Sequence, residues 1–524
     1  MHPLYSVLEI RAIEHAARAQ LRPGTLMQRA GLAAAKFAQA LLAPLHGKGA
    51  ANVLLLAGPG DNGGDALEMA AHLAQAGMTV SVCCMGQSEA VSQTANKTAA
   101  GTASIGRQQA LQRAQNCALH FEEHAASAIK TGRWDLVVDG LFGIGLTRAL
   151  DAETRQIVAM INQLRCPVLA LDVPSGLDAD SGAVLGADDD EDGMAVCASH
   201  TLTFIGDKPG LHTCDGRDHA GMVQIASLDI GPGLMPAATA CLNDTSLFAH
   251  WLKPRRQNTH KGSFGDVVVI GGAHGMAGAP VLAARSALLC GAGRVHVAFI
   301  DGAPLFDDAH PELMFKRASD FDWKLDLKNA ALVAGPGLGA SAPARALLER
   351  VIGSDQALLL DADALNLIAR HPELQTMLAR RSAPAVLTPH PLEAARLLGV
   401  TASAVQADRL GAARKLAKQL QAIIVLKGSG SIIAAAGGMA VINPSGNPAL
   451  ATAGSGDVLS GVCGALLAQG WPQWEAALGA AWLHGLAADQ LVAAGLGPIG
   501  ICASELIPAL RVALNRLAQR SIIL

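Results

Sequence analysis

The sequence predicts an α/β protein of two domains built on parallel sheets, and three observations support this. The chain has 524 residues, which at about 150 residues per domain leaves room for two to four domains. It contains 56 Gly but only 3% aromatic residues, whereas β-sandwiches and barrels normally use more aromatics. Short apolar runs also alternate with longer helical stretches, which is typical of parallel sheets covered by helices on both faces.

Each half of the chain has its own series of expected strands. In the first half they lie at residues 52–57, 79–84, 135–139, 167–172, 201–205 and 222–226, with helices between them, for example at 65–76 and 152–164. In the second half they lie at 266–271, 294–299, 330–335, 357–361, 385–388 and 422–427, and the chain is expected to be helical from 456 to about 520. The alternation predicts one parallel sheet per half.

A linker-like stretch separates the two halves at residues 230–243. It holds Gly231, Pro232, Gly233 and Pro236, which are typical of turns and loops. We therefore expect one domain over residues 1–235 and another over 243–524. The acidic run at 188–192 is expected to be a solvated loop, and a functional role for it stays open.

Composition and charge exclude several classes of function. The formal net charge is −4 and the pI is about 6.5, which argues against a nucleic-acid partner. Mean hydropathy is high at +0.30, but no run of about 20 clean apolar residues is present. The charged residues Glu9, Arg11 and Glu14 argue against a signal peptide. Ten Cys without a CxxC pair indicate reduced, buried thiols and a cytoplasmic protein.

Two short motifs match known patterns without strong support. The segment from His120 to His124 fits the H-x-x-E-H zinc pattern, but no third ligand is evident, so a solvated helix face is expected. Gly58 to Gly63 fits GxGxxG after a strand. A dinucleotide-binding Rossmann unit would also show an acid about 20 residues on, and none stands there. A redox dinucleotide site is therefore the lesser interpretation.

The same glycine-rich loop is better interpreted as a ligand-binding strand–helix turn. It is formed by Asp61, Asn62, Gly63, Gly64 and Asp65. Glycines allow a ligand to approach the backbone closely, and free amides at a helix start suit a phosphate. Asp65 is expected at the helix cap, where it could fix the loop. A plain strand–helix turn stays open as the alternative.

Two further loops, at residues 139–148 and 171–178, end strands of the same sheet. In open parallel sheets, ligands bind outside the carboxyl ends of the strands, so the three loops are expected to converge. Asn62, Asp139 and Ser175 offer hard oxygen atoms. Such atoms suit an alkali or alkaline-earth ion better than a transition metal.

These three motifs together resemble the NAD(P)H-hydrate epimerase domain, over roughly residues 1–230. The resemblance implies that Asn62, Asp139 and Ser175 hold a potassium ion. It also implies contacts with the hydrated dinucleotide from Asp61, Asn62, Gly63, Gly64, Asp65, Gly143, Ile144, Gly145, Leu146, Thr147, Arg148, Ala149 and Asp172.

The sequence departs from the family's pattern at Asp61, where Asn is common, and at Ala66, where Gly is common. The extra charge of Asp61 is expected to weaken binding of an anionic substrate. Asp172 is the candidate acid–base group, and a loop-fixing carboxylate is its alternative. Lys208 is expected either to face a phosphate or to be solvated.

In the second half, Gly454, Ser455, Gly456 and Asp457 open an Ala-rich helix. Amides at that helix start form an anion hole for a transferring phosphate, and Asp457 could accept a proton from a substrate hydroxyl. The helix start is expected to lower the pKa of Asp457. No GxxxxGK[ST] motif exists in the chain, which excludes a P-loop. The GxGD arrangement resembles ribokinase-fold phosphoryl-transfer enzymes, and a plain helix cap is the alternative.

Further motifs at residues 260–265, 271–279, 361–366, 388–393 and 427–431 narrow this resemblance. Together they are similar to the ADP-dependent NAD(P)H-hydrate dehydratase, over about residues 251–524. The resemblance implies that the hydrate contacts Ala279, Gly337, His390 and Asp457, although His390 could simply be a packed turn residue. It implies that ADP, with Mg²⁺, is held by Lys427, Gly428, Ser429, Gly430, Ser431 and Gly456.

The whole chain thus resembles the bifunctional NAD(P)H-hydrate repair family. The resemblance implies a Rossmann-like three-layer α/β/α domain followed by a ribokinase-like α/β domain, in a homo-oligomer. It implies that R- and S-NADHX and NADPHX are interconverted and that the S form is dehydrated to NAD(P)H while ADP gives AMP and phosphate. The alternative is a ribokinase-fold vitamin kinase with a non-catalytic N-terminal dinucleotide-binding module.

Overall fold

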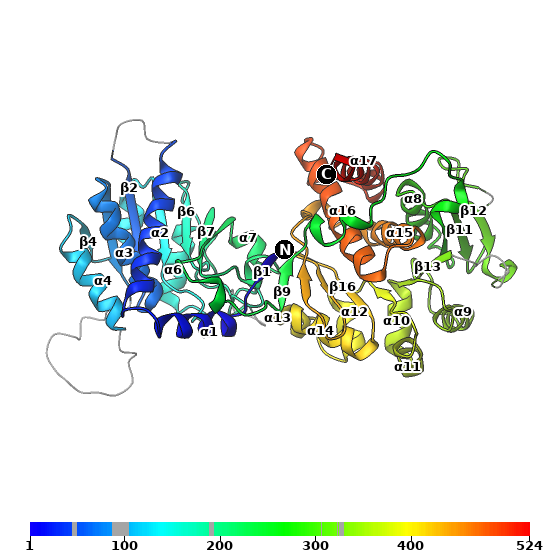
Figure 1. The fold of residues 1–524 in the computed structure, drawn as a ribbon, viewed down its shortest axis with the longest axis horizontal. Coiled ribbons are helices and arrows are strands. Elements are labelled where there is room, and N and C mark those ends of the chain that lie inside the picture. The colour runs from blue at the N-terminus through cyan, green and yellow to red at the C-terminus, as the bar shows by residue number, and fades with distance from the viewer. Residues whose placement is uncertain are drawn as a thin grey trace. The chain divides into compact units, whose positions relative to one another are not determined.

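A computed structural model describes residues 1–44, 50–85, 104–187, 193–304, 306–321, 323 and 330–523. The chain forms two compact units, one over Pro3–Ala238 and one formed by Met1–His2 with Thr239–Leu524 (Figure 1). The acidic run at 188–192 lies outside the described residues. Among the described helices, none combines enough length and apolarity to cross a membrane.

The first unit contains a seven-stranded parallel sheet with the order β4-β3-β2-β5-β6-β7-β8. Its strands are β2 (Asn52–Ala57), β3 (Thr79–Cys84), β4 (His120–Glu122), β5 (Leu136–Gly140), β6 (Val168–Leu171), β7 (His200–Phe204) and β8 (Met222–Ala226). The strand order reverses between β2 and β5, so the loops that leave these two strands part and open a crevice between them.

Helices cover both faces of this sheet, and the alternation of side chains along β2 shows why. Val53 and Leu55 pack with the helices α1 to α4, whereas Leu54 and Leu56 pack with α5 and α6. The helices are α1 (Val7–Arg18), α2 (Thr25–Leu42), α3 (Asp61–Gln75), α4 (Ile105–Gln115), α5 (Ala125–Thr131), α6 (Ala152–Ile161) and the short α7 (Gly216–His219). The predicted three-layer α/β/α architecture is confirmed.

The second unit contains an eleven-stranded sheet with the order β1-β9-β18-β17-β16-β15-β14-β13-β10-β11-β12. Its strands are β1 (His2–Leu4), β9 (Ala240–Leu242), β10 (Asp266–Gly271), β11 (Arg294–Phe299), β12 (Met314–Arg317), β13 (Ala330–Ala334), β14 (Leu358–Leu360), β15 (Val386–Leu387), β16 (Ile423–Leu426), β17 (Ile432–Ala434) and β18 (Ala440–Ile442). From β12 to β16 the sheet is parallel, and β17 pairs antiparallel with its two neighbours, β16 and β18.

Ten helices are described in this unit and lie on the two faces of its sheet (Figure 1). One face carries α8 (Gly278–Leu289), α15 (Ser455–Ala468), α16 (Gln473–Ala493) and α17 (Ala503–Ile523); the other carries α9 (Ala342–Ile352), α10 (Asp363–Arg370), α11 (Pro372–Ala379), α12 (Pro391–Leu398), α13 (Ala402–Ala407) and α14 (Arg409–Leu420). A Cβ at Gly461 would lie 2.0 Å from the carbonyl oxygen of Ala283. Only glycine therefore lets α15 pack this closely on α8.

Three local expectations are wrong. The segment at His120 is the edge strand β4 and not a helix, and among the described residues no group of three His, Cys, Asp or Glu could hold a metal ion. The expected linker does not extend to Asn243, because β9 pairs with β18 and Asn243 donates to the side chain of Asn443. All ten cysteines are free, but Cys197 and Cys502 are exposed.

Candidate active sites

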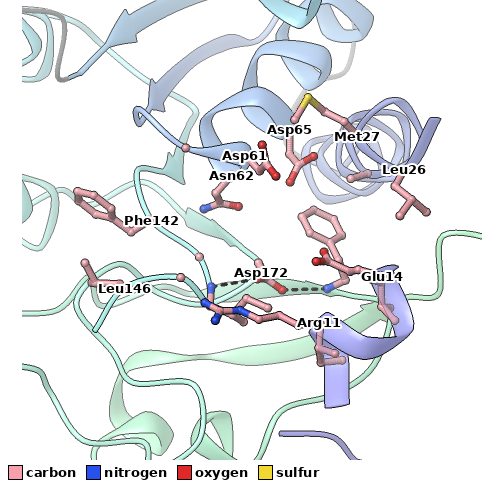
Figure 2. A pocket seen from close by; sticks show the side chains of 18 of the residues that line it. Arg11, Glu14, Leu26, Met27, Asp61, Asn62, Asp65, Phe142, Leu146 and Asp172 are labelled. Atoms are coloured by element: carbon pink, nitrogen blue, oxygen red, sulfur yellow. Dashed lines mark hydrogen bonds between the residues drawn. The ribbon is translucent and has the colours of Figure 1, made fainter. Parts of the chain in front are cut away.

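A pocket of about 490 Å³ lies in the first unit, at the carboxyl ends of its strands (Figure 2). Helices α1 and α2 and the loop after β5 complete its walls. The structure brings together here ten of the predicted residues: Asp61, Asn62, Asp65, Gly143, Ile144, Gly145, Leu146, Thr147, Arg148 and Asp172. The convergence expected of the three loops is therefore present.

Gly63, Gly64 and Ala149 do not line this pocket. A Cβ at Gly63 would lie 2.0 Å from the carbonyl oxygen of Gly58, and one at Gly64 would lie 2.5 Å from Cε of Met27. These two glycines are therefore required by packing of the loop and of α2, independently of any ligand.

Asp172 is held in the pocket wall by a buried lysine. Lys208 has no exposed surface, and its Nζ donates to Asp172 Oδ1 at 2.5 Å, to Thr203 Oγ1 at 2.7 Å and to the carbonyl of Phe204 at 2.8 Å. Asp172 has a φ of +67°, a strained conformation for a residue with a side chain. Its second oxygen accepts the backbone N–H of Ile144 at 3.3 Å. Both expectations for Lys208, a solvated side chain or one facing a phosphate, are wrong.

Asp65 lies in the second turn of α3 and not at the helix cap, because the helix already begins at Asp61. Its carboxyl group lines the pocket, and no hydrogen bond or ion pair reaches it within the described part of the chain. Burial, and then the negative charges of Asp172, Asp61 and Glu14, raise the pKa of Asp65 well above its ordinary value. These surroundings favour the protonated form of Asp65 more than those of an exposed aspartate would.

The sequence reasoning did not find the contribution of α1 to this pocket. Arg11, Glu14 and Arg18 all line it. Arg18 Nη2 lies 3.3 Å from Asp61 Oδ2, and the Ser104 hydroxyl donates to Asp61 Oδ1 at 2.5 Å. The extra charge of Asp61 is thus partly offset by the protein. The spacing of Arg11, Glu14 and Arg18 along one helical face was the available signal.

Asp139 at the end of β5 and Ser175 after β6 form a buried pair, and Asn62 lines the pocket from the first turn of α3. The Ser175 hydroxyl donates to Asp139 Oδ1 at 2.6 Å, and the Ser175 N–H donates to Asp139 Oδ2 at 2.8 Å. Asp139 is fully buried, and burial raises its pKa to about 6. Asn62 Oδ1 is buried without a hydrogen-bond partner. A buried oxygen without a partner beside a carboxylate fits a cation of low charge.

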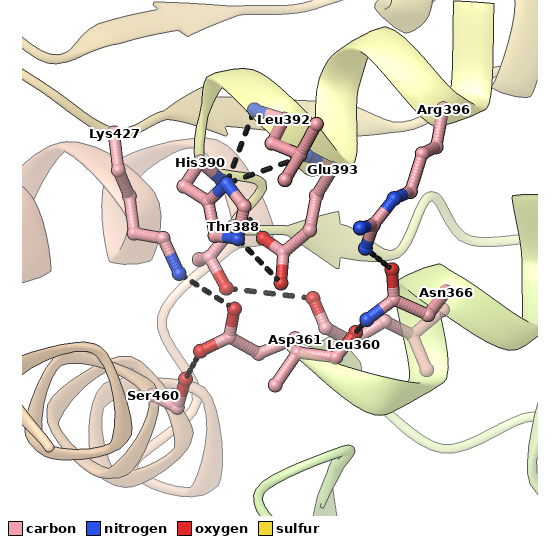
Figure 3. A network of polar contacts seen from close by, with 11 residues as sticks. Leu360, Asp361, Asn366, Thr388, His390, Leu392, Glu393, Arg396, Lys427 and Ser460 are labelled. Atoms are coloured by element: carbon pink, nitrogen blue, oxygen red, sulfur yellow. Dashed lines mark hydrogen bonds and ion pairs between the residues drawn. The ribbon is translucent and has the colours of Figure 1, made fainter. Parts of the chain in front are cut away.

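In the second unit, the start of α15 faces a lysine–aspartate pair (Figure 3). Lys427 Nζ donates to Asp361 Oδ1 at 2.8 Å, and the Ser460 hydroxyl donates to Asp361 Oδ2 at 2.7 Å. A Cβ at Gly456 would lie 3.3 Å from Lys427 Nζ. The free amides of the helix start and a lysine cation therefore adjoin, which makes an anion site.

Asp457 lies in the first turn of α15, and the predicted fall of its pKa is wrong. Burial and, after it, the negative charge of Asp361 raise its pKa to about 6 against the opposing charge of Lys427. Desolvation and the carboxylate of Asp361 outweigh the helix start. Asp457 is therefore a better proton acceptor near neutral pH than the sequence indicated.

His390 begins α12 and is a capping residue with an exposed edge. Its ring Nδ1 accepts hydrogen bonds from the backbone N–H groups of Leu392 at 3.1 Å and Glu393 at 3.3 Å. The backbone N–H of His390 donates to Glu393 Oε2 at 2.8 Å. Burial, followed by the charge of Lys427, lowers the pKa of His390. Burial also raises the pKa of Glu393 to about 7. The turn role left open for His390 is thus present, and its Nε2 lies 3.4 Å from Glu393 Oε1.

The other predicted residues of this unit lie on neighbouring loops. Gly337, at φ +58°, accepts the Ala273 N–H, and its Cβ position is 3.5 Å from the Cβ of Ala279. Gly428, at φ +140°, begins the β16–β17 turn that also holds Ser429, Gly430 and Ser431. The buried Arg409 supports this turn by donating to the Lys427 carbonyl at 3.3 Å. Asp361, Glu393 and Ser460 were not predicted as site residues, although the motifs at 361–366 and 388–393 contained the first two.

Comparison with known proteins gives a match in each half. A family model described as NAD(P)H-hydrate dehydratase matches residues 267–507, and one described as YjeF-related protein N-terminus matches residues 23–210.

Similar proteins cover either the whole chain or its second half. The chain is 37% identical to the bifunctional NAD(P)H-hydrate repair enzyme Nnr of Coxiella burnetii, over 98% of this chain and 100% of that protein. It is 44% identical to the ADP-dependent (S)-NAD(P)H-hydrate dehydratase of Neisseria meningitidis, over 52% of this chain and 92% of that protein. A solved ADP/ATP-dependent NAD(P)H-hydrate dehydratase from Bacillus subtilis is 31% identical, covers 54% of this chain and 100% of its own, and has a TM-score of 0.47.

Proposed function

The chain belongs to the family of bifunctional NAD(P)H-hydrate repair enzymes, and from this premise we propose how its residues divide the repair. The enzyme interconverts the epimers of hydrated nicotinamide cofactors and dehydrates the S form with ADP. We assign epimerisation to residues 1–235 and dehydration to residues 243–524. The start of α15 supports the assignment of dehydration most directly, because Lys427 lies next to Gly456 and Asp457 there.

In the proposed dehydration, Asp457 accepts the proton of the C6 hydroxyl while that oxygen attacks the terminal phosphate of ADP. The Gly456 amide and Lys427 stabilise the charge on the transferring phosphate. Phosphate is then a good leaving group, and the N1 lone pair expels it from C6 to give an N1=C6 double bond. Loss of a proton from C5 then forms the C5=C6 double bond and restores the neutral dihydropyridine. Ala279, Gly337 and His390 bind the hydrate, and Gly428, Ser429, Gly430 and Ser431 bind ADP. Mg²⁺ would accompany the diphosphate, and the carboxylates of Asp361 and Asp457 near Lys427 would be the residues to hold it.

The pocket of the first unit is the proposed epimerase site. The loop residues that line it and Asp172 contact the hydrated dinucleotide, and Gly63, Gly64 and Ala149 act from behind the pocket wall. A potassium ion would be held by Asn62, Asp139 and Ser175, because the orphan oxygen of Asn62 and one carboxylate suit a monovalent ion. When bound, the ion supplies positive charge beneath the substrate. The full chain is further proposed to act in the cytoplasm as a homo-oligomer.

The direct test mixes the full chain with ADP and one hydrate epimer at a time, and follows the absorbance of the restored dihydropyridine. Both epimers should be converted completely, the R form after a lag. A vitamin kinase with a non-catalytic first unit would convert neither. An enzyme with an inactive first unit would convert only the S form.

Separate units should each keep their own activity. A fragment of residues 3–238 is expected to epimerise, and one of residues 239–524 to dehydrate the S form, because each contains its own sheet and site. A fragment that starts at 243 should be less stable, because it lacks β9, which pairs with β18. Turnover of each fragment and its melting temperature test this. A soluble, folded fragment without activity would contradict the domain assignment.

Potassium should matter to the first unit alone. Asp139→Ala is expected to lower epimerisation and to abolish its response to potassium, because it removes the only carboxylate of the cation site. S-form dehydration by the same molecules is the internal control and should be unchanged. Potassium should also raise the melting temperature of the wild-type first unit, but not that of the variant. Equal wild-type epimerisation with and without potassium would count against the cation site.

A further inference from the structure

Two carboxyl groups in the first-unit pocket have opposite surroundings. Asp172 is paired with the buried Lys208, which makes two further hydrogen bonds and cannot move away without losing them. Asp65 has no cation partner within the described residues, although Arg18 is held nearby by Asp61. Figure 2 shows that Asp65 extends from α3 and Asp172 from the loop after β6, and that both point into the pocket.

A difference of this kind assigns opposite proton-transfer roles. We propose that Lys208 is a positioning residue that fixes the orientation of the Asp172 carboxylate, so that Asp172 accepts a proton while Asp65 donates one during epimerisation. This rests on the proposed epimerase function and deepens it. A role in substrate binding does not explain why a lysine is buried against Asp172. It also does not assign Asp65 as a proton donor.

The chemistry of the hydrate fits such a pair. The C6 atom bears a hydroxyl and is bonded to the ring nitrogen N1. A proton from Asp65 lets the hydroxyl leave as water while the N1 lone pair forms an N1=C6 double bond. A second water adds to the opposite face of C6 and gives its proton to Asp172. One water leaves, one water enters, and the ring is neither oxidised nor reduced. The proton gained by Asp172 returns through solvent to Asp65, which restores both groups for the next turnover.

The pocket presents charges of both signs to the intermediate of this route. The N1=C6 species carries a positive charge on the ring. Glu14, Asp61 and Asp172 bring carboxylates to the pocket, and Arg11, Arg18 and Arg148 bring cations. Asp61 is paired with Arg18 and Asp172 with Lys208, so Asp65 is a pocket carboxyl that no ion pair among the described residues neutralises.

The test uses the full chain and the pure R epimer with ADP. Lys208→Met and Asp65→Asn are each expected to lower the kcat of epimerisation by about 10²–10⁴-fold, with little change in KM. Dehydration of the S epimer by the same molecules should be unchanged. The matched control is Arg294→Met, which leaves the buried Asp266 without its arginine partner in the second unit. It should keep normal epimerisation per folded molecule.

A double variant distinguishes the positioning role of Lys208 from its contribution to the stability of the first unit. Lys208→Met with Asp172→Asn removes the unpaired buried charge, so it should recover the melting temperature lost by Lys208→Met while epimerisation stays absent. Epimerisation in H₂¹⁸O should place one solvent oxygen on C6 in each event. Normal kcat in folded Lys208→Met or Asp65→Asn would overturn the roles, and retention of the original oxygen would overturn the water route. Absence of epimerisation in the wild type would instead overturn the proposed function.

Discussion

Replacing Asp457 by Asn should lower dehydration of the S hydrate by about 10²–10⁴-fold, the usual contribution of a general base. The variant keeps the shape of the side chain and removes the charge that accepts the proton. ADP affinity should stay within a few-fold, because Lys427 and Gly456 are intact. Epimerisation should be unchanged, because its pocket is formed by residues of the other unit. Steady-state kinetics on each epimer measure both reactions in one preparation.

The pH profile gives a second readout of Asp457. Its pKa is raised to about 6, and only the ionised form accepts a proton. Wild-type dehydration should therefore fall as the pH drops through about 6, and the residual activity of Asp457→Asn should lack this limb. Asp266→Asn is the matched control, because Asp266 pairs with Arg294 at the opposite, amino end of β10 and β11. Turnover near the wild-type level in Asp457→Asn, with a lower melting temperature, would indicate a capping role instead.

Lys427→Met should destabilise the second unit and abolish ADP-dependent turnover together. Asp361 is 1% exposed, so the substitution leaves a buried carboxylate with only the hydroxyl of Ser460. Breaking a buried pair in this way costs about 3–5 kcal/mol. Burial lowers the pKa of Lys427, but Asp361 and Glu393 together raise it above its ordinary value, so the lysine is a full cation at any physiological pH. Chemical denaturation and turnover measure the two effects.

A double variant distinguishes the structural from the functional part of Lys427. Lys427→Met with Asp361→Asn removes both charges, and replacing a buried pair by neutral groups is often close to neutral for stability. Stability should largely return while turnover stays absent. Normal turnover in the folded double variant would remove Lys427 from the nucleotide site.

The long parallel strands could be predicted from the sequence, whereas several short strands could not. The strands at residues 52–57 and 266–271 have the bounds expected, because each is buried on both faces and shows as a nearly continuous apolar run. β17 and β18 have three residues each and lie among glycines that signal loops. The strand β4 at His120 lacks an apolar run, so its pairing with β3 was decided by tertiary contacts.

The loops of both sites could be located from their motifs, but the charge states within them could not. The rise in the pKa of Asp457 depends on Asp361, which is 96 residues away along the chain and reaches the site only through the sheet. Lys208 was ambiguous because a lysine in a Lys-Pro-Gly turn is usually solvated. Lys208 is buried against Asp172 because β6 and β7 are neighbours in the sheet. The local sequence around Lys208 does not reveal this pairing.

The cap that His390 forms on α12 fixes the tautomer of its imidazole. Because Nδ1 accepts two backbone N–H groups, the ring proton of neutral His390 must be on Nε2. A second proton would displace both N–H groups and unpin the first turn of α12. Nε2 in turn lies 3.4 Å from Glu393 Oε1, so neutral His390 has no free acceptor nitrogen with which to take a proton from the substrate. Because backbone N–H groups of α12 occupy Nδ1, the imidazole of His390 cannot act as a base, and a carboxylate must accept the proton.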